Sequence, residues 1–398
     1  MSQKMMKIGI LTLHRPANFG ANLQAYSTYR YLLRRGCEVK VIDYVRDRDC
    51  LYRSVIPALQ MQAHTHFVET LLPLTRQVSS VQALRDVVYE ERFDMVLIGA
   101  DAVWSMPKSD NVYFAQWLFS DVRISGTKVA SLAPAHMGDG FMGLSAEARN
   151  DIGQSLRQFH YVTVRDRWTR LVVNRDIFCS QPFVKEICPD PVFTLQDSLA
   201  GVPWQSNGKV SKGYYLMTLP PDWGSGRLFG KRRKWWFKKF RSLVNGAGYA
   251  LVEAPLPEGR SGMSFDYTLD YPIDPIQWYL WIVNAKAFCG LRFHALVSAI
   301  SSGTPFYSID SYGDRSMLGI FLDVVGCHRL ARRRDGTSKI ANLLADNGFR
   351  SYRTGLYLEW ESPSRVFHML EEMDVRSILA CRDRLREAFE RQMDNILR

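Results

Sequence analysis

The amino-acid sequence predicts an α/β fold made of two doubly wound, Rossmann-like domains followed by C-terminal helices. Two observations lead to this prediction. Short apolar runs typical of buried strands alternate with helical segments through most of the 398 residues. The alternation begins a second time after a polar segment with Gly and Ser at 198–212. We therefore expect one domain over residues 1–197, a second over 198–362, and terminal helices over 363–398.

The first half opens with a strand–helix–strand unit. Residues 7–13 are a short strand, 20–35 repeat apolar side chains at helical spacing, and 38–44 are the next strand. Such a unit places its two strands parallel with a right-handed crossover, so we expect a parallel sheet. Further strands are expected at 93–99, 128–133 and 161–165, with helices within 49–92 and at 146–159 and 165–173.

The second half repeats the pattern. Strands are expected at 214–219, 249–253, 287–290 and 304–309, and helices at 275–285 and up to Ser302, where Gly303 is a natural helix stop. Two such halves predict twin domains that face each other across a cleft, an arrangement of the glycosyltransferase-B-like kind.

A strand-to-helix corner in the second half is the main candidate site. Arg292 and His294 follow the strand at 287–290 and precede a helix. The free backbone N–H groups and the dipole at a helix N-terminus favour an anion. The spacing of two residues in an extended turn puts both side chains on one side. A charged guanidinium beside a titratable imidazole suits a carboxylate or phosphate substrate that must also receive a proton.

Composition narrows the classes of function. The formal net charge of +11 attracts anions. No zinc-finger, RNA-binding or basic-leucine signature is present, so no nucleic-acid partner is expected. Seven Cys are scattered without a Cys-x-x-Cys pair, which indicates reduced thiols in a cytoplasmic protein without a metal site. We also expect no signal peptide, no membrane-spanning run and no dinucleotide site, since Gly-x-Gly-x-x-Gly is missing.

Several short motifs together resemble the polysaccharide pyruvyl transferase family. They stand here as Asn18-Phe-Gly-Ala-Asn-Leu-Gln-Ala25, Gly99-Ala-Asp-Ala-Val-Trp104, Val164-Arg-Asp166, Asp190-Pro191 and Arg292-Phe-His294-Ala295. Their order and spacing match the family over about half of the chain. Two positions depart from its pattern, because Ala100 replaces Ser and Ala295 replaces Gly.

The resemblance implies pyruvyl transfer from phosphoenolpyruvate to a sugar in a polysaccharide or its lipid-linked precursor. The product is a pyruvate ketal, and no cofactor is needed beyond this donor. His294 is the expected catalytic acid, and Arg292, Arg165 and Leu291 the expected donor-binding residues. The expected acceptor-binding residues are Asn18, Gly20, Gln24, Asp101 and Trp104. The first domain is the expected acceptor side and the second the donor side.

Each of these residues also has a structural interpretation. Arg165 could form an ion pair with Asp166 or a neighbouring carboxylate. Asn18 and Gly20 could serve only to make the turn, because both tolerate positive φ. Trp104 could belong to the core rather than form a surface that stacks on sugar.

The basic aromatic run at 231–241 has two interpretations. It could be a crossover helix with its apolar face on the sheet, which is the simpler one. Alternatively, it could contact the inner membrane surface and reach a lipid-linked sugar there.

Two other functions stay open besides pyruvyl transfer. One is a glycosyltransferase of the same fold that uses a nucleotide sugar. The other is a basic, non-enzymatic module that binds nucleic acid or membrane.

Overall fold

The chain forms two compact units. The computed structural model describes residues 5–45, 55–105, 111–138, 140–206, 208, 210, 213–221, 223, 230–310, 338–355 and 361–398. The N-terminal unit consists of Met1–Ser54, His64–Ala200 and Arg384–Arg398, and the C-terminal unit of Val55–Ala63 and Gly201–Asp383. The division at Ala200 lies three residues beyond the expected one.

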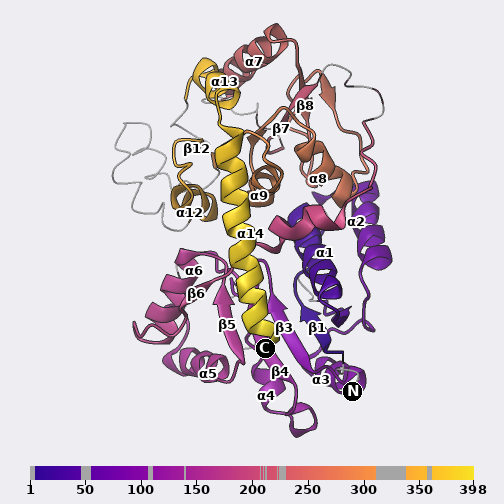
Figure 1. Ribbon diagram of the computed structural model, residues 1–398, viewed down its shortest axis with the longest axis vertical. Helices are drawn as coiled ribbons and strands as arrows, with labels where there is room; N and C mark the ends of the chain where they lie inside the picture. The colour runs from indigo at the N-terminus through magenta and orange to yellow at the C-terminus, as the bar shows by residue number, and fades with distance from the viewer. Residues whose placement is uncertain are drawn as a thin grey trace. The chain divides into compact units, whose positions relative to one another are not determined.

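The N-terminal unit contains a parallel sheet in the order β2-β1-β3-β4-β5-β6 (Figure 1). Its strands are β1 (Lys7–Leu11), β2 (Glu38–Val41), β3 (Met95–Gly99), β4 (Lys128–Leu132), β5 (Tyr161–Val164) and β6 (Glu186–Ile187). The helices are α1 (Phe19–Arg34), α3 (Val81–Glu91), α4 (Gln116–Phe119), α5 (Ala146–Arg157) and α6 (Arg167–Val172), with shorter turns at Val112–Phe114, Val122–Ile124, Val173–Ile177 and Pro191–Ser198. Helix α2 (Ala58–Leu71) belongs to this unit from His64 onward.

The C-terminal unit contains a second parallel sheet, in the order β12-β11-β10-β7-β8-β9. Its strands are β7 (Tyr214–Thr218), β8 (Ala250–Glu253), β9 (Tyr267–Thr268), β10 (Ala287–Gly290), β11 (Phe306–Asp310) and β12 (Arg353–Gly355). The helices are α7 (Gly230–Gly246), α8 (Pro275–Val283), α9 (Phe293–Ser302), α12 (Lys339–Asp346) and α13 (Pro363–Glu371), followed by α14 (Val375–Leu397). The predicted α/β fold with two doubly wound halves is confirmed.

Each sheet has a point where the strand order reverses. In the N-terminal sheet the chain moves one way from β1 to β2 and the other way from β1 to β3. In the C-terminal sheet the same reversal separates β7 from β10. Open α/β sheets bind ligands beside the carboxyl ends of the strands at such a switch point. The loops after β1, β3, β7 and β10 are therefore the places to look for a site.

Local sequence signals explain where the helices beside these loops begin and end. Asp274 caps α8 by accepting hydrogen bonds from two backbone N–H groups. Pro275 occupies the first turn, where a backbone N–H has no partner within the helix and is not needed. Gly303 ends α9 with a φ of 77°, a left-handed conformation that glycine adopts without strain. These signals fix the length of the strand–helix segment that carries Arg292 and His294.

The C-terminal helices expected at 363–398 are α13 and α14, and their residues are divided between the two units. Val366 and Leu370 of α13 are buried in the core of the C-terminal unit. From Arg384 onward α14 belongs to the N-terminal unit, where Phe389 packs edge-on against Tyr31 of α1. The apolar face of α13 is thus buried in the C-terminal unit, and the end of α14 packs in the N-terminal unit.

α7 connects the adjacent parallel strands β7 and β8, and it packs Trp236, Phe237 and Phe240 on the sheet. This is the packing that the crossover interpretation predicts. In the part of the chain that the structure describes, no helix is both long enough and apolar enough to span a bilayer.

Candidate active site

The carboxyl ends of β7 and β10 are held together backbone to backbone. Thr218, the last residue of β7, accepts a hydrogen bond from the Leu291 N–H at 3.0 Å and donates its Oγ1 hydrogen to the Leu291 carbonyl at 2.8 Å. Gly290 lies so close to Thr218 that an added Cβ would stand 2.7 Å from the Thr218 nitrogen. Glycine is therefore required where β10 leaves the sheet, since any side chain would push the strands apart.

Arg292 projects from this corner in a strained backbone conformation. Its φ is 84°, in the left-handed half of conformational space that non-glycine residues rarely occupy. Such strain is found more often at functional sites than elsewhere. The Arg292 side chain is 47% exposed, and its guanidinium lies 2.6 Å from the Glu258 carboxylate. An exposed pair of this kind contributes little stability, so an anionic ligand can compete with Glu258 for Arg292.

His294 lies in the first turn of α9, two residues after Arg292, and is half-buried. The side chain of Arg292, the N-cap residue, forms no hydrogen bond with the first-turn N–H groups of this helix. The corner thus combines a guanidinium, an imidazole and the positive end of a helix dipole. Together they suit an anion that also exchanges a proton.

Leu291 does not have the form of a donor-binding residue. Its side chain is buried in the core of the C-terminal unit, and both its backbone N–H and its carbonyl are bonded to Thr218. Leu291 therefore fastens the corner to β7, and its binding of the donor stays a prediction.

The N-terminal unit holds a separate polar cluster built by Gln24, Asp101, Arg165 and Asp190. Arg165 Nη1 lies 3.3 Å from Asp190 Oδ2 and 4.0 Å from Asp101 Oδ1. Gln24 Nε2 donates to the same Asp190 oxygen at 2.5 Å. Gln24 Oε1 is buried, and no described residue donates to it. Asp101 is the most accessible member, with a side chain 13% exposed and a φ of 70°.

Arg165 was expected to bind the donor, but its side chain is only 2% exposed and is paired with Asp190. The structural interpretation of an ion pair therefore holds, with Asp190 in place of Asp166 as the partner. Asp166 instead caps α6, accepting hydrogen bonds from the N–H and hydroxyl of Thr169.

Asn18 and Gly20 lie at the start of α1, at the carboxyl end of β1. Asn18 Oδ1 accepts a hydrogen bond from the Gly20 N–H at 2.9 Å, so the side chain caps the helix. The φ of Asn18 is −140°, which means that tolerance of positive φ is not the reason for Asn here. The amide of Asn18 is exposed and keeps its N–H₂ group for an additional partner.

Trp104 is fully buried and cannot stack on a sugar in this conformation. Its ring is 0% exposed and stacks on Phe114, and its Nε1 donates to the Tyr113 carbonyl at 3.0 Å. This burial agrees with the alternative in which Trp104 belongs to the core, and the acceptor contact stays a prediction. The segment Val112–Phe119 folds over the loop after β3 and converts Trp104 into a core residue.

A second polar group near β1 was not predicted from the sequence. His14 Nε2 lies 3.0 Å from Asp43 Oδ1, and Arg15 Nη2 lies 2.6 Å from Asp43 Oδ2. His64 Nδ1 contacts Asn22 Oδ1 at 2.5 Å, and Asn22 Nδ2 donates to the His14 carbonyl. The only sequence signal was the presence of polar residues, such as Asn22, on an otherwise apolar helix face.

Burial and charge change the acidity of two groups in this network. Although burial opposes it, the pKa of Asp43 is well below its usual value because Arg15 and His14 hydrogen-bond to the carboxylate. Burial lowers the pKa of His64 from 6.5 to about 3, so its ring stays neutral. With Nδ1–H donating to Asn22, the Nε2 of His64 is a buried acceptor to which no described residue donates.

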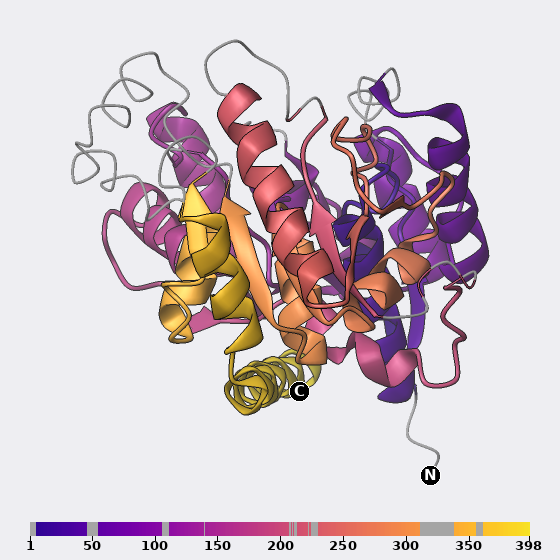
Figure 2. The same ribbon diagram turned by 90° about the horizontal axis from the view of Figure 1, so that it is seen from above.

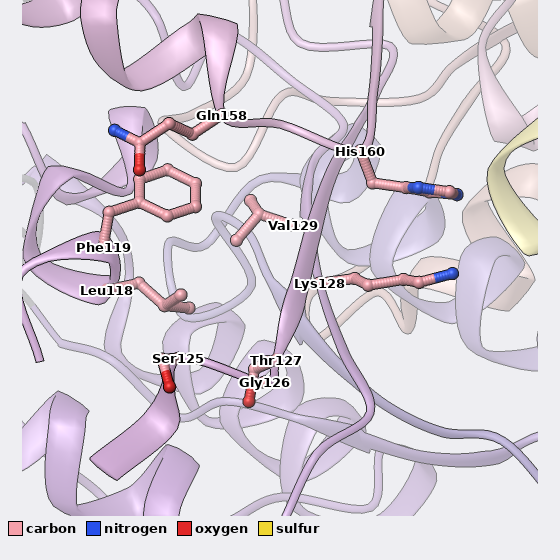
Figure 3. A pocket seen from close by; sticks show the side chains of 9 residues that line it. All are labelled: Leu118, Phe119, Ser125, Gly126, Thr127, Lys128, Val129, Gln158 and His160. Carbon is pink, nitrogen blue, oxygen red and sulfur yellow. The ribbon is translucent and has the colours of Figure 1, made fainter. Parts of the chain in front are cut away.

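A pocket lies beside the amino end of β4 in the N-terminal sheet (Figure 3). Leu118, Phe119 and Val129 are among its lining residues. The side chains of Lys128 and His160 point away from these three. Ligands of open α/β sheets bind at the carboxyl ends, so this pocket is not the candidate site. Within the described ranges, no three His, Cys, Asp or Glu side chains are grouped to hold a metal ion.

Solved structures with a similar fold include an epimerase and a glycosyltransferase. UDP-GlcNAc 2-epimerase from Methanocaldococcus jannaschii aligns at 10% identity, with a TM-score of 0.51, over 96% of this chain and 100% of that chain. The glycosyltransferase SnogD from Streptomyces nogalater aligns at 13% identity, with a TM-score of 0.50, over 98% of each chain. At such low identity these likenesses show the fold alone, which is of the glycosyltransferase-B-like class. No curated protein sequence matches the chain.

The sequence itself identifies the family. The profile described as polysaccharide pyruvyl transferase matches residues 18–312, which is more than half of the chain. The match begins at the cap of α1 and ends just after β11, so it includes both the polar cluster of the N-terminal unit and the corner at Arg292. The chain therefore belongs to the polysaccharide pyruvyl transferase family.

Proposed function

We propose that the protein transfers the pyruvyl group of phosphoenolpyruvate to two hydroxyls of a sugar, in a polysaccharide or its lipid-linked precursor. The observation that carries this proposal is the corner between β10 and α9. There an exposed guanidinium, an imidazole and the start of a helix follow one another within three residues, Arg292 to His294. Phosphoenolpyruvate carries a carboxylate and a phosphate a few bonds apart, and this corner offers one donor group to each.

Arg292 binds the carboxylate of the donor in this proposal. Its planar fork matches the two carboxylate oxygens, and its side chain is exposed. Glu258 releases the guanidinium when the donor arrives. The phosphate lies against the first-turn N–H groups of α9, where the helix dipole favours its charge.

His294 supplies the proton that starts the reaction. Protonation of the donor methylene carbon leaves positive charge on the neighbouring carbon, which a sugar hydroxyl attacks. The bond from that carbon to the phosphate oxygen then breaks, and a second hydroxyl closes the ketal. The two hydroxyls together give up two protons. One replaces the proton that His294 donated, and the other leaves with the phosphate, so atoms and charge balance.

The acceptor sugar contacts the N-terminal unit in this proposal. Asp101 is the accessible polar group beside the switch point of that sheet. Gln24 is as buried as Arg165 and Asp190, so it supports the acceptor site through its hydrogen bond to Asp190. Asn18 offers its exposed amide N–H₂ group. Arg165 and Asp190 position these groups rather than touch the donor, because both are buried.

A thermal-shift experiment tests the proposal against nucleotide-sugar binding. The melting temperature is measured with phosphoenolpyruvate and, separately, with uridine and guanosine sugar nucleotides. We expect stabilisation by phosphoenolpyruvate, and mass spectrometry of the wild-type protein with candidate glycans should detect a pyruvyl ketal. Stabilisation by a sugar nucleotide alone, without a ketal product, would contradict the proposal and favour a glycosyltransferase.

A further inference from the structure

Helix α7 has a buried face and an exposed face, and packing in the core explains the residues of the buried face only. Trp236, Phe240 and Val244 form the buried face and belong to the core of the C-terminal unit. Trp236 Nε1 also donates to the Glu361 carbonyl at 2.9 Å. Residues on the opposite side are exposed. Figure 2 shows α7 as one continuous helix. The crossover role of α7 accounts for its buried face only.

The exposed face is centred on Trp235. This indole is 62% exposed, more than any other aromatic side chain that the structure describes. Exposure of this ring leaves a large, mostly apolar surface in water, and its N–H gives it one polar end. Four cations surround it at helical spacing, three or four residues before and after it: Lys231, Arg232, Lys238 and Lys239, all exposed.

The charges of this face are unbalanced. The 17 residues of α7 contain no Asp or Glu. Among the described residues, no carboxylate forms an ion pair with these four cations, whereas Arg241, at the edge of the helix, pairs with Asp266 at 2.5 Å. Lys234 and Lys238 stand four residues apart, where like charges repel and destabilise a helix. This repulsion destabilises the helix in the free protein. Binding to an anionic surface would neutralise the like charges and remove the repulsion.

We propose that the exposed face of α7 docks the C-terminal unit on a membrane surface that contains anionic lipid. Lysines attract the lipid headgroups, and the single Trp235 inserts at headgroup level, where indole rings partition. A helix with one packed face and one cationic aromatic face suits a flat interface. A nucleic acid is a poorer match, because Lys outnumbers Arg around the indole. Proteins that bind single strands also use several aromatic rings for successive bases, and this face has one. This proposal does not depend on the chemistry at Arg292 and His294.

Vesicle flotation with the full chain tests the proposal. The two vesicle compositions are phosphatidylglycerol mixed with phosphatidylcholine, and phosphatidylcholine alone, each at low and high salt. We expect binding to the anionic vesicles at low salt, weakening as salt rises. Neutralising three lysines in K231Q/K238Q/K239Q should weaken binding on the order of a hundredfold, because each cation contributes about fivefold. The variant W235Q should weaken it about tenfold through lost apolar burial.

Matched variants control for net charge and for apolar exposure. K128Q/K185Q/R350Q removes three exposed cations elsewhere, and L171Q removes an exposed apolar side chain from α6. Both should bind vesicles as the wild type does, and melting curves should show all variants folded. Equal loss in the charge control, or full binding by W235Q, would overturn the proposal. Binding of a labelled nucleic acid that depends on α7, without vesicle binding, would overturn it too.

Discussion

Gly290 and Thr218 pair at the carboxyl ends of β10 and β7 so closely that the Thr218 backbone occupies the space a Gly290 side chain would need. This contact fixes the point where the chain turns from β10 into α9. Arg292 and His294 follow within four residues, so their placement depends on it.

Gly290→Ala should therefore damage both stability and activity. The added methyl group would stand 2.7 Å from the Thr218 nitrogen, and neither backbone can move without breaking the sheet. We expect the free energy of unfolding to fall by about 2 to 3 kcal/mol, as for an overpacked core. Chemical denaturation measures the change. Gly246→Ala in α7, where an added Cβ meets no atom within 4 Å, is the control and should leave stability nearly unchanged. Equal effects of the two changes would contradict the packing argument.

The Arg292–Glu258 pair predicts opposite effects of two substitutions on phosphoenolpyruvate binding. Arg292→Ala removes charge-assisted hydrogen bonds worth about 1.5 to 3 kcal/mol, so the KM for phosphoenolpyruvate should rise about 10- to 100-fold. Glu258→Gln removes the carboxylate that lies 2.6 Å from the guanidinium in the free protein. An exposed pair is worth at most about 1 kcal/mol, so this KM should fall by no more than about fivefold. Steady-state kinetics decides, and an increased KM in Glu258→Gln would show that Glu258 positions Arg292.

Asp190→Ala should destabilise the N-terminal unit strongly. It removes a carboxylate from the guanidinium of Arg165, whose side chain is 2% exposed. Breaking a buried pair on one side costs about 3 to 5 kcal/mol. Asp197→Ala is the matched control, because Asp197 pairs with Arg386 near the surface and its loss should cost less than about 1 kcal/mol. Urea unfolding of both variants gives the comparison, and a small loss in Asp190→Ala would mean that Arg165 has no need of this carboxylate.

His64 predicts a pH dependence of stability. Its folded pKa is about 3, against 6.5 as a free side chain, so between these values the unfolded chain binds a proton that the folded one does not. The free energy of unfolding should therefore fall as pH falls below 6.5, by about 1.4 kcal/mol per pH unit. The lowered pKa of Asp43 acts in a different window, because its contribution is present above about pH 4 and is lost only below it.

The substitution His64→Asn keeps an N–H donor for Asn22 and removes the titrating ring. It should flatten the dependence between pH 6.5 and 4, measured by denaturant unfolding at several pH values. His66→Asn is the control, since it removes an exposed histidine from the same helix, α2. An unchanged slope in His64→Asn would show that His64 does not stay neutral in the folded protein.

Local signals made the C-terminal corner predictable. The strand at 287–290 was expected with its observed bounds, and the helix expected at 275–285 is found at Pro275–Val283. Gly303, Pro275 and the apolar runs act over a few residues, so the sequence is enough to read them. Arg292 and His294 could be placed at a helix start for the same reason.

Contacts between distant segments could not be predicted in this way. Gln24 and Asp190 are 166 positions apart, and Asn22 and His64 are 42 apart. Such pairs depend on which strands become neighbours, and single residues carry no mark of it. Trp104 shows the same limit, because its burial depends on Phe114 folding back over the loop.

The most direct test of the proposed chemistry is the rate of phosphate release from phosphoenolpyruvate in the presence of a glycan that the wild-type protein converts to a ketal. If His294 donates the proton, His294→Ala should lower kcat about 10²- to 10⁴-fold. His368→Ala, which removes an exposed histidine of α13 in the same unit, should leave the rate unchanged. A near-wild-type rate in His294→Ala would contradict the central claim that the imidazole at this corner is the catalytic acid.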